Sequence, residues 1–323
     1  MTMTLPKLTK KQQEILQLLY RYRFLNRIQI QQFMGHADKR RIITWLKDLR
    51  DKNYVVWIYS TDFTEKSKPA IYYLGLNGIR YLRTLVWDND SGSVYQPAEL
   101  HKRYREKDRT HSFIERSTLI ASCCVALEAV NRGKADTIPS TVAATEIAST
   151  TANTIRTGSK DFLQNTPTNS SSRISYAHYT YYTEADYLDP DSDYHFLSEH
   201  ETLRPNLCVV KQKGRTTTTY LLEIFDPTLP HYRVRSRLKA YVNYLVDSEW
   251  EGAAPEPVIL LAFPTLYGLI YAKRRVKKLL LDEYYETEDI PEDLHIHFTT
   301  TEHLQAVGIT ANVWEEGRKR LGV

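Results

Sequence analysis

Residues 38–60, DKRRIITWLKDLRDKNYVVWIYS, join a helical pattern directly to a strand-like one. Asp38 is a typical helix cap, and the segment after it repeats apolar residues at the spacing of one buried helical face. These apolar residues are Ile42, Trp45, Leu46 and Leu49. The β-branched and aromatic residues of 54–60 then favour a strand. At about 100° per residue, the other side of the helix carries Arg40, Thr44, Lys47 and Asp51, and Lys39 and Arg41 flank it.

The elements on either side extend this pattern. The sequence predicts a helix from Thr9, a helix from Asn26, a second strand within 70–75 and a further helix at 77–86. Thr9 with Gln12, and Asn26 with Gln29, form capping boxes that begin the first two helices. Three helices followed by a hairpin is the order of a winged helix-turn-helix. We therefore predict a winged helix DNA-binding domain over residues 1–87.

The charge of this region indicates an anionic partner. Residues 1–86 hold 16 Lys and Arg against six Asp and Glu, a net +10 in a chain whose total is +4. In a helix-turn-helix, the start of the second helix meets base edges in the major groove, where Arg and Lys bond bases or phosphates. We predict that double-stranded DNA contacts Arg27, Lys39, Arg40, Arg41, Thr44, Lys47, Lys66 and Lys68. The alternatives are a solvated helix face and a winged helix that binds protein.

The remainder of the chain is expected to form a larger α/β domain. Residues 88–97 have the composition of a linker, and 98–131 predict one long helix. A long insertion rich in Ser, Thr and Tyr follows at about 136–202. From 203 onward predicted helices alternate with strands, which favours a mixed sheet. The predicted fold class is therefore α/β, with a mixed-sheet, restriction-endonuclease-like domain at 98–323.

Residues 203–226, LRPNLCVVKQKGRTTTTYLLEIFD, have the layout of the second and third strands of a PD-(D/E)xK nuclease. That chemistry needs carboxylates on Mg²⁺ and a nearby Lys that activates water. Glu223 fits the motif. Asn206, however, takes the place of the motif's Asp, and Phe225 takes the place of its Lys. Asn is a neutral ligand, so a Mg²⁺ site here would lose one negative charge, and its possible ligands are Glu223 and Asp226. Possible substitutes for the missing groups are Asp226, Lys239, Glu115 and Glu146.

These segments resemble the replication-relaxation proteins of plasmids and mobile elements. The resemblance rests on LTKKQQEILQLLYRYRFLNRIQIQQFMG, RRIITWLKDLRDKNYVV and KPAIYYLGLNGIRYL, and extends more loosely to RTHSFIERSTLIA, 203–226 and RSRLKAYVNYL. It implies a winged-helix DNA-binding domain, a nuclease-like domain and a role in replication or relaxation. Carried over, Asn206, Glu223 and Lys239 take the Asp, Glu and Lys positions of the nuclease motif. The change from Asp to Asn favours a domain that positions DNA or a partner without cutting.

Other functions stay open beside this one. One is a Mg²⁺-dependent endonuclease or nickase that acts at an origin, and another is a transcriptional repressor. A separate nickase site is suggested by His295 and His297, because alternate residues of a strand face one side and can hold one metal. Its nucleophile would be one of the nearby tyrosines, Tyr271, Tyr284 or Tyr285.

Composition narrows the class of protein. No apolar run approaches the roughly 18 residues of a membrane span, and the polar N-terminus has no secretory signal, so we expect a cytoplasmic protein. Three cysteines, two of them adjacent, make a poor disulfide framework, and there is no Cys-x-x-Cys zinc motif. We expect no cofactor unless the nuclease-like site holds Mg²⁺. The expected partners are duplex DNA, with a replication or transfer protein or a second copy of the chain.

Overall fold

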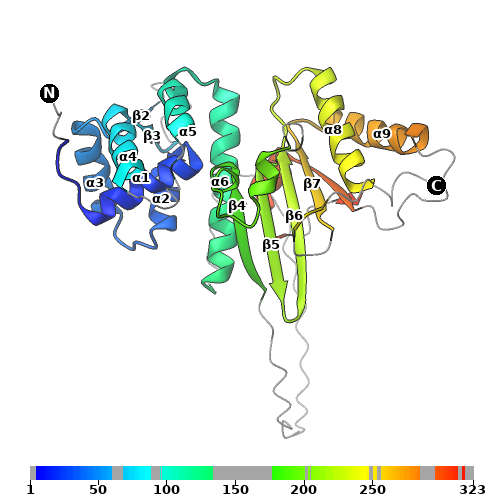
Figure 1. Ribbon diagram of the computed structural model, residues 1–323, viewed down its shortest axis with the longest axis horizontal. Helices are drawn as coiled ribbons and strands as arrows, with labels where there is room; N and C mark the ends of the chain where they lie inside the picture. The colour runs from blue at the N-terminus through cyan, green and yellow to red at the C-terminus, as the bar shows by residue number, and fades with distance from the viewer. Residues whose placement is uncertain are drawn as a thin grey trace, which may run out of the picture.

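The computed structural model describes residues 5–59, 68–88, 95, 97–133, 177–200, 203, 205–246, 250–252, 256–283, 295–311 and 315–316. The first elements are α1 (Lys10–Tyr22), β1 (Leu25–Asn26), α2 (Arg27–Phe33), α3 (Lys39–Asp51), β2 (Val55–Ile58), β3 (Ile71–Leu74) and α4 (Leu76–Asp88). The three short strands form an antiparallel sheet in the order β1-β3-β2. Helices α1 to α4 pack around this sheet at one end of the molecule (Figure 1).

Local chemistry explains where these helices begin, and it confirms the predicted caps. Thr9 and Gln12 form a reciprocal capping box at α1, and Asn26 and Gln29 do the same at α2. The Asp38 carboxylate accepts a hydrogen bond from the backbone of Arg40 and so begins α3. On α3 the apolar residues face inward as predicted: Ile42, Leu46 and Leu49 are buried, and Trp45 is half-buried.

The second part contains α5 (Pro97–Lys102), the 3₁₀ helix η1 (Arg103–Asp108), α6 (His111–Asn131), β4 (His178–Thr183), α7 (Glu184–Tyr187), η3 (His195–Ser198), β5 (Leu207–Lys213), β6 (Thr216–Ile224), α8 (His231–Val246), β7 (Val258–Phe263), α9 (Leu266–Glu283), β8 (Ile296–Thr300), α10 (Thr301–Val307) and β9 (Glu315–Glu316). Its sheet has the order β4-β5-β6-β7-β8-β9. Strands β4, β5 and β6 are antiparallel, β7 and β8 run parallel to β6, and β9 is antiparallel. The predicted mixed sheet is therefore confirmed.

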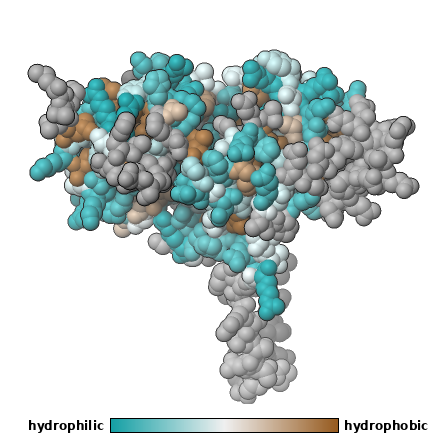
Figure 2. Space-filling view, viewed as in Figure 1, coloured by the Kyte–Doolittle hydropathy of each residue, from teal (hydrophilic) through white to brown (hydrophobic). Residues whose placement is uncertain are grey.

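Helices cover both faces of this sheet. Leu222 and Leu260 belong to the apolar cluster that includes α6 and the N-terminal helices, whereas Leu221 and Leu261 face α8 and α9. Helix α6 stands between the N-terminal helices and the sheet (Figure 1). Because the first cluster runs without a break from α1 to α10, the two parts of the molecule share one core. The face seen in Figure 2 is largely hydrophilic, with small apolar patches.

One sequence prediction about this region was wrong. The helix expected over 98–131 is broken, because η1 turns Arg103 and Glu106 into the interior and Thr110 then caps a new helix, α6. The end of the expected insertion is ordered secondary structure, β4, α7 and η3, while its first part lies outside the described residues. Most of the predicted linker 88–97 also lies outside them. Within the part of the chain that is described, no helix is long and apolar enough to cross a membrane.

Candidate functional site

The outer side of α3 is an exposed basic face. Lys39, Arg40, Arg41, Thr44 and Lys47 are all exposed, as their position opposite the buried residues predicts. Ile43 lies among them and is 46% exposed, so the face is cationic with one apolar side chain at its centre. We call these six residues the α3 face.

The side chains of the α3 face leave most of their donors unused. Thr44 Oγ1 donates to the Arg40 carbonyl at 3.0 Å, and Arg41 Nε lies 3.9 Å from an Asp38 carboxylate oxygen. Within the described residues, Lys39, Arg40 and Lys47 make no side-chain hydrogen bond or ion pair. The face thus offers long cationic groups to an external acceptor.

The other predicted DNA-binding residues lie apart from α3. Arg27 is half-buried on α2 and donates to Gln31 at 3.4 Å. Lys68 is exposed just before β3, and Lys66 lies outside the described residues. Two aromatic residues that the sequence predicted only as strand, Trp57 and Tyr59, are 43% and 49% exposed, with ring centroids 5.9 Å apart.

A second candidate site lies where β5 and β6 begin and end. Asn206 is buried, and its backbone N–H donates to the Leu222 carbonyl at 2.8 Å. Its side-chain oxygen accepts from the Ile224 backbone at 2.8 Å, and its amide donates to Glu184 at 3.4 Å. Asn206 therefore ties β5 to β6 and to α7, and both side-chain polar atoms are in use.

Glu223 on β6 is 3% exposed and faces α8. Arg237 Nη2 donates to its two carboxylate oxygens at 2.8 and 2.9 Å, and the Tyr241 hydroxyl donates at 2.9 Å. Burial raises the pKa of the Glu223 carboxyl, while the Arg237 charge opposes that rise. The same burial raises the pKa of the Tyr241 hydroxyl well above its usual value. The carboxylate is thus held by three hydrogen bonds from one helix.

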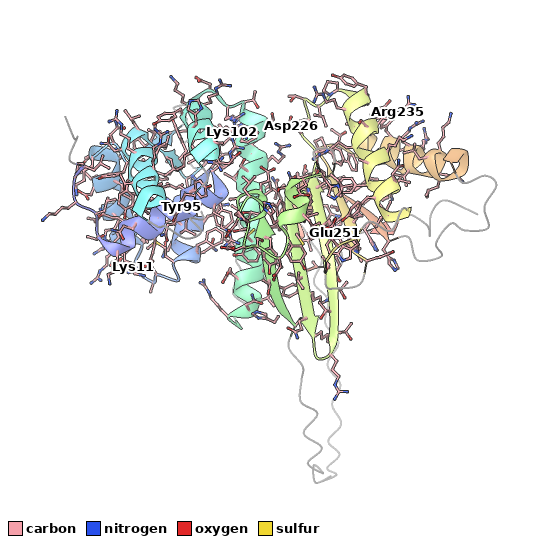
Figure 3. The ribbon with its side chains drawn as sticks, in the orientation of Figure 1. Lys11, Tyr95, Lys102, Asp226, Arg235 and Glu251 are labelled. Atoms are coloured by element: carbon pink, nitrogen blue, oxygen red, sulfur yellow. The ribbon has the colours of Figure 1, made fainter. Side chains whose placement is uncertain are left out.

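Asp226 and Lys239 differ from Glu223 in their surroundings. Asp226 accepts from the Thr228 backbone and hydroxyl at 2.8 and 2.6 Å, and from Ser112 at 3.3 Å. It lies between α6 and α8 (Figure 3). Lys239 is exposed. It lies two positions after Arg237, so it points about 200° around the helix axis from Arg237. The structure therefore brings Arg237, rather than Lys239, to Glu223.

These groups do not fit a divalent cation. The oxygens of Glu223 and Asn206 are engaged by protein donors, and Arg116 and Arg237 line the same cleft of about 430 Å³ as Glu223. Mg²⁺ needs several oxygen ligands and a net negative surrounding. Among the described residues, no three His, Cys, Asp or Glu side chains are arranged to hold a metal. Glu115 is exposed beside His111 at 3.2 Å, and Glu146 lies outside the described residues.

The histidine pair suggested as a nickase site is only partly described. His295 and His297 have nearly parallel rings with centroids 6.4 Å apart. Tyr271 packs against His231 at 5.1 Å, and Tyr284 and Tyr285 lie outside the described residues.

Comparison with known proteins gives one match. The model of a family described as replication-relaxation matches residues 16–256, from α1 to the segment just before β7. The match therefore covers the α3 face and the Asn206–Glu223 region together. No curated protein and no solved structure matches the chain.

Proposed function

Because this chain belongs to the replication-relaxation family, we propose that it is a DNA-binding protein acting in the replication or relaxation of a plasmid, phage or other mobile element. The observation that carries this proposal is the α3 face, whose cationic side chains are all exposed. Within the described residues Lys39, Arg40 and Lys47 have no ion-pair partner, and Arg41 has one contact with Asp38, at 3.9 Å. An exposed basic surface of this kind is the electrostatic footprint of nucleic-acid binding.

The order of elements supports a winged helix as the DNA-binding unit. A short turn separates α2 from α3, and an antiparallel β2–β3 pair follows α3. In that motif the second helix, which is α3 in this chain, enters the major groove. Arg40 and Lys47 then reach bases and phosphates, and Thr44 lies between them. Lys68 is close to the β2–β3 connection. In a winged helix this connection is the wing, which contacts the phosphate backbone of the DNA.

We further propose that the domain of residues 98–323 is nuclease-like but does not cleave DNA. The antiparallel β5–β6 pair with Asn206 opposite the Glu223 region supports the nuclease-like layout. The ion pair between Glu223 and Arg237 supports the loss of cleavage, because a guanidinium occupies the carboxylate that a metal needs. In this proposal the domain positions DNA or binds a replication or transfer protein.

A nicking assay on supercoiled plasmid with Mg²⁺ or Mn²⁺ tests the proposal. We expect the wild-type protein to bind duplex DNA in a gel-shift assay and to leave the plasmid supercoiled. Glu302→Ala serves as a matched control for Glu223→Ala, since Glu302 is an exposed carboxylate on α10. Metal-dependent nicking that is lost in Glu223→Ala and kept in Glu302→Ala would establish an endonuclease instead. Absence of duplex binding would reject the DNA-binding role.

A further inference from the structure

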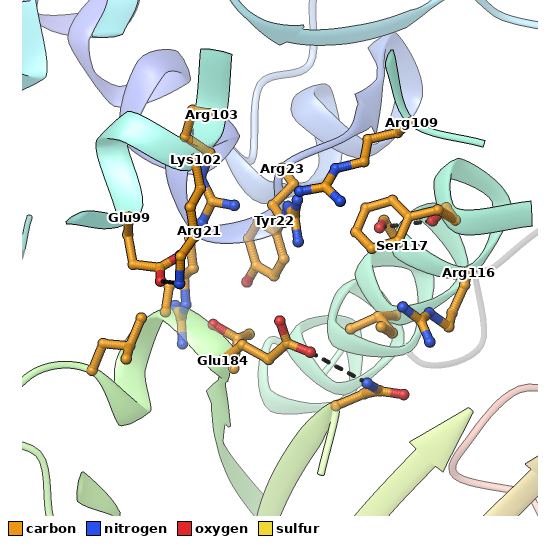
Figure 4. A pocket seen from close by; sticks show the side chains of 16 residues that line it. Arg21, Tyr22, Arg23, Glu99, Lys102, Arg103, Arg109, Arg116, Ser117 and Glu184 are labelled. Atoms are coloured by element: carbon orange, nitrogen blue, oxygen red, sulfur yellow. Dashed lines mark hydrogen bonds and ion pairs between the residues drawn. The ribbon is translucent and has the colours of Figure 1, made fainter. Parts of the chain in front are cut away.

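A pocket of about 160 Å³ lies where the end of α1, α5, η1 and α6 meet α7. Among the described residues its walls carry six cationic side chains, Arg21, Arg23, Lys102, Arg103, Arg109 and Arg116 (Figure 4). Two acidic side chains line it as well, Glu99 and Glu184. We call this cavity the arginine pocket.

Four of the six cations have a carboxylate oxygen within 3.3 Å. Arg21 pairs with Asp186 at 2.9 Å, and Lys102 pairs with Glu99 at 2.5 Å. Arg23 and Arg103 share the carboxylate of Glu106, at 2.7 and 3.3 Å. Glu106 and Asp186 pair with these cations but do not line the pocket, so the acids at or next to it number four against six cations. The pocket therefore keeps a net positive charge.

Arg109 and Arg116 are the more weakly partnered cations. Arg109 Nε forms an ion pair with Glu106 at 3.6 Å, which is beyond hydrogen-bond distance. Arg116 makes no hydrogen bond or ion pair within the described residues, although, against the effect of burial and after the hydrogen bonds from Thr228, its charge lowers the pKa of Asp226. The Nε atoms of both are buried and lack a hydrogen-bond partner. A buried donor without an acceptor destabilises the fold unless a ligand supplies one.

Three guanidinium groups of the arginine pocket pack against the ring of Phe113. The central carbons of Arg23, Arg109 and Arg116 lie 4.4, 4.9 and 5.2 Å from the centroid of its ring. Cation–π contacts hold the guanidinium planes without consuming their N–H donors. Burial, and then the charge of Arg23, lower the pKa of Arg103, which reflects the crowding of like charges. Such a group of cations is stabilised by an anion placed among them.

We propose that the arginine pocket binds a phosphate group. Guanidinium pairs recognise phosphate oxygens with paired, charge-assisted hydrogen bonds, and they are better suited to this than ammonium groups. The volume of about 160 Å³ leaves room for a phosphate group together with several water molecules. Arg116 lines both this pocket and the cleft of Glu223 and Asp226, so the phosphate lies beside the nuclease-like site.

The phosphate has two possible sources, a DNA strand or a free nucleotide. If the proposed DNA-binding function is right, a DNA strand held by the α3 face supplies the phosphate. Only this source rests on the proposed function, because a free nucleotide could bind without it. The pocket joins the N-terminal helices to the sheet domain, so a bound strand would connect the two parts of the protein.

The direct test is thermal unfolding of the full chain in inorganic phosphate against chloride at equal ionic strength. We expect phosphate to raise the melting temperature with saturation, since a ligand that binds only the folded state stabilises it. The rise should disappear in Arg109→Gln/Arg116→Gln and persist in Arg215→Gln/Arg235→Gln, which removes two exposed arginines (Arg235 is labelled in Figure 3). A wild-type melting temperature that does not change with phosphate overturns the inference. This comparison uses the wild-type protein alone, so it does not depend on the folding of a variant.

Competition experiments then identify the source. If inorganic phosphate displaces a labelled oligonucleotide, and the Arg109→Gln/Arg116→Gln variant binds it about tenfold more weakly, the phosphate belongs to a strand. If a nucleoside triphosphate raises the melting temperature and oligonucleotide binding is unaltered in that variant, the source is a nucleotide. A phosphate effect of equal size in that variant places the anion elsewhere and overturns the inference. Failure of the DNA-binding function is seen separately, as the absence of duplex binding by the wild-type protein in the gel-shift assay.

Discussion

Replacing Arg40 and Lys47 together by Ala is expected to weaken duplex binding strongly while leaving the fold intact. Both side chains are exposed and make no hydrogen bond or ion pair within the described residues. Their truncation should therefore change the free energy of unfolding by no more than about 0.5 kcal/mol. Seven residues of helix separate them, about 10 Å along its axis, which is far enough for their effects on binding to add.

The size of the loss follows from the contacts that each side chain makes in a groove. A base or phosphate contact contributes roughly 1–3 kcal/mol, so the pair contributes roughly 2–6 kcal/mol. Because about 1.4 kcal/mol is tenfold in affinity, Kd should rise at least about 30-fold. The slope of log K against log salt should fall by about 0.9 for each phosphate contact that is lost.

Fluorescence anisotropy with a duplex selected from a random pool, at several salt concentrations, measures both quantities. The matched control is Arg274→Ala/Lys278→Ala, which removes an exposed Arg and an exposed Lys from α9. Circular dichroism of each variant verifies folding. An unchanged Kd for the α3 variant, or an equal loss in the α9 variant, refutes the assignment of DNA binding to the α3 face.

Three further predictions concern stability. Arg237→Ala leaves buried Glu223 without its cation and should cost about 3–5 kcal/mol in urea unfolding near neutral pH. Burial raises the pKa of the Glu223 carboxyl. The stability that the protonated carboxyl contributes is therefore present at a pH below the ordinary pKa of Glu, and it is lost as the pH rises through the raised pKa. The loss of stability caused by Arg237→Ala should shrink in acid, and a loss that does not change with pH contradicts this account. Gly78→Ala would put a Cβ 2.3 Å from the Tyr54 carbonyl oxygen, so the melting temperature should fall, whereas exposed helical Gly→Ala changes usually raise it. Gln29→Ala removes a capping box and two 2.8 Å hydrogen bonds to α6, so we expect a loss of about 1–3 kcal/mol in urea unfolding; a loss under about 0.5 kcal/mol would show that these bonds contribute little.

The N-terminal elements could be predicted because their determinants are local. Thr9 with Gln12 and Asp38 before α3 satisfy backbone donors within one helical turn, so the sequence alone places the helix starts. The buried side of α3 follows from helical periodicity, which also predicts the exposure of Arg40, Thr44 and Lys47. The β5–β6 hairpin was predictable from two β-rich runs around Gly214, where φ is +62°.

The rest of the site depends on contacts between distant residues. Nothing local in the sequence predicts that Arg237 binds Glu223, because a helix and a strand must first pack together. The expected Lys239 lies two residues further along α8, on its exposed side. The arginine pocket likewise draws on α1, α5, η1, α6 and α7, with lining residues from Arg21 to Asn206. Tertiary packing also overrode helical propensity at η1, where Arg103 and Glu106 turn inward.

Site-directed disulfide crosslinking tests most directly whether the α3 face enters the groove of DNA. The three natural cysteines, Cys123, Cys124 and Cys208, are buried, so a single cysteine introduced by Thr44→Cys is the reactive one. We predict that it crosslinks to a duplex carrying a thiol on a major-groove base edge, and that a cysteine introduced by Lys278→Cys on α9 does not. Crosslinking at position 278 with none at position 44 would contradict the account.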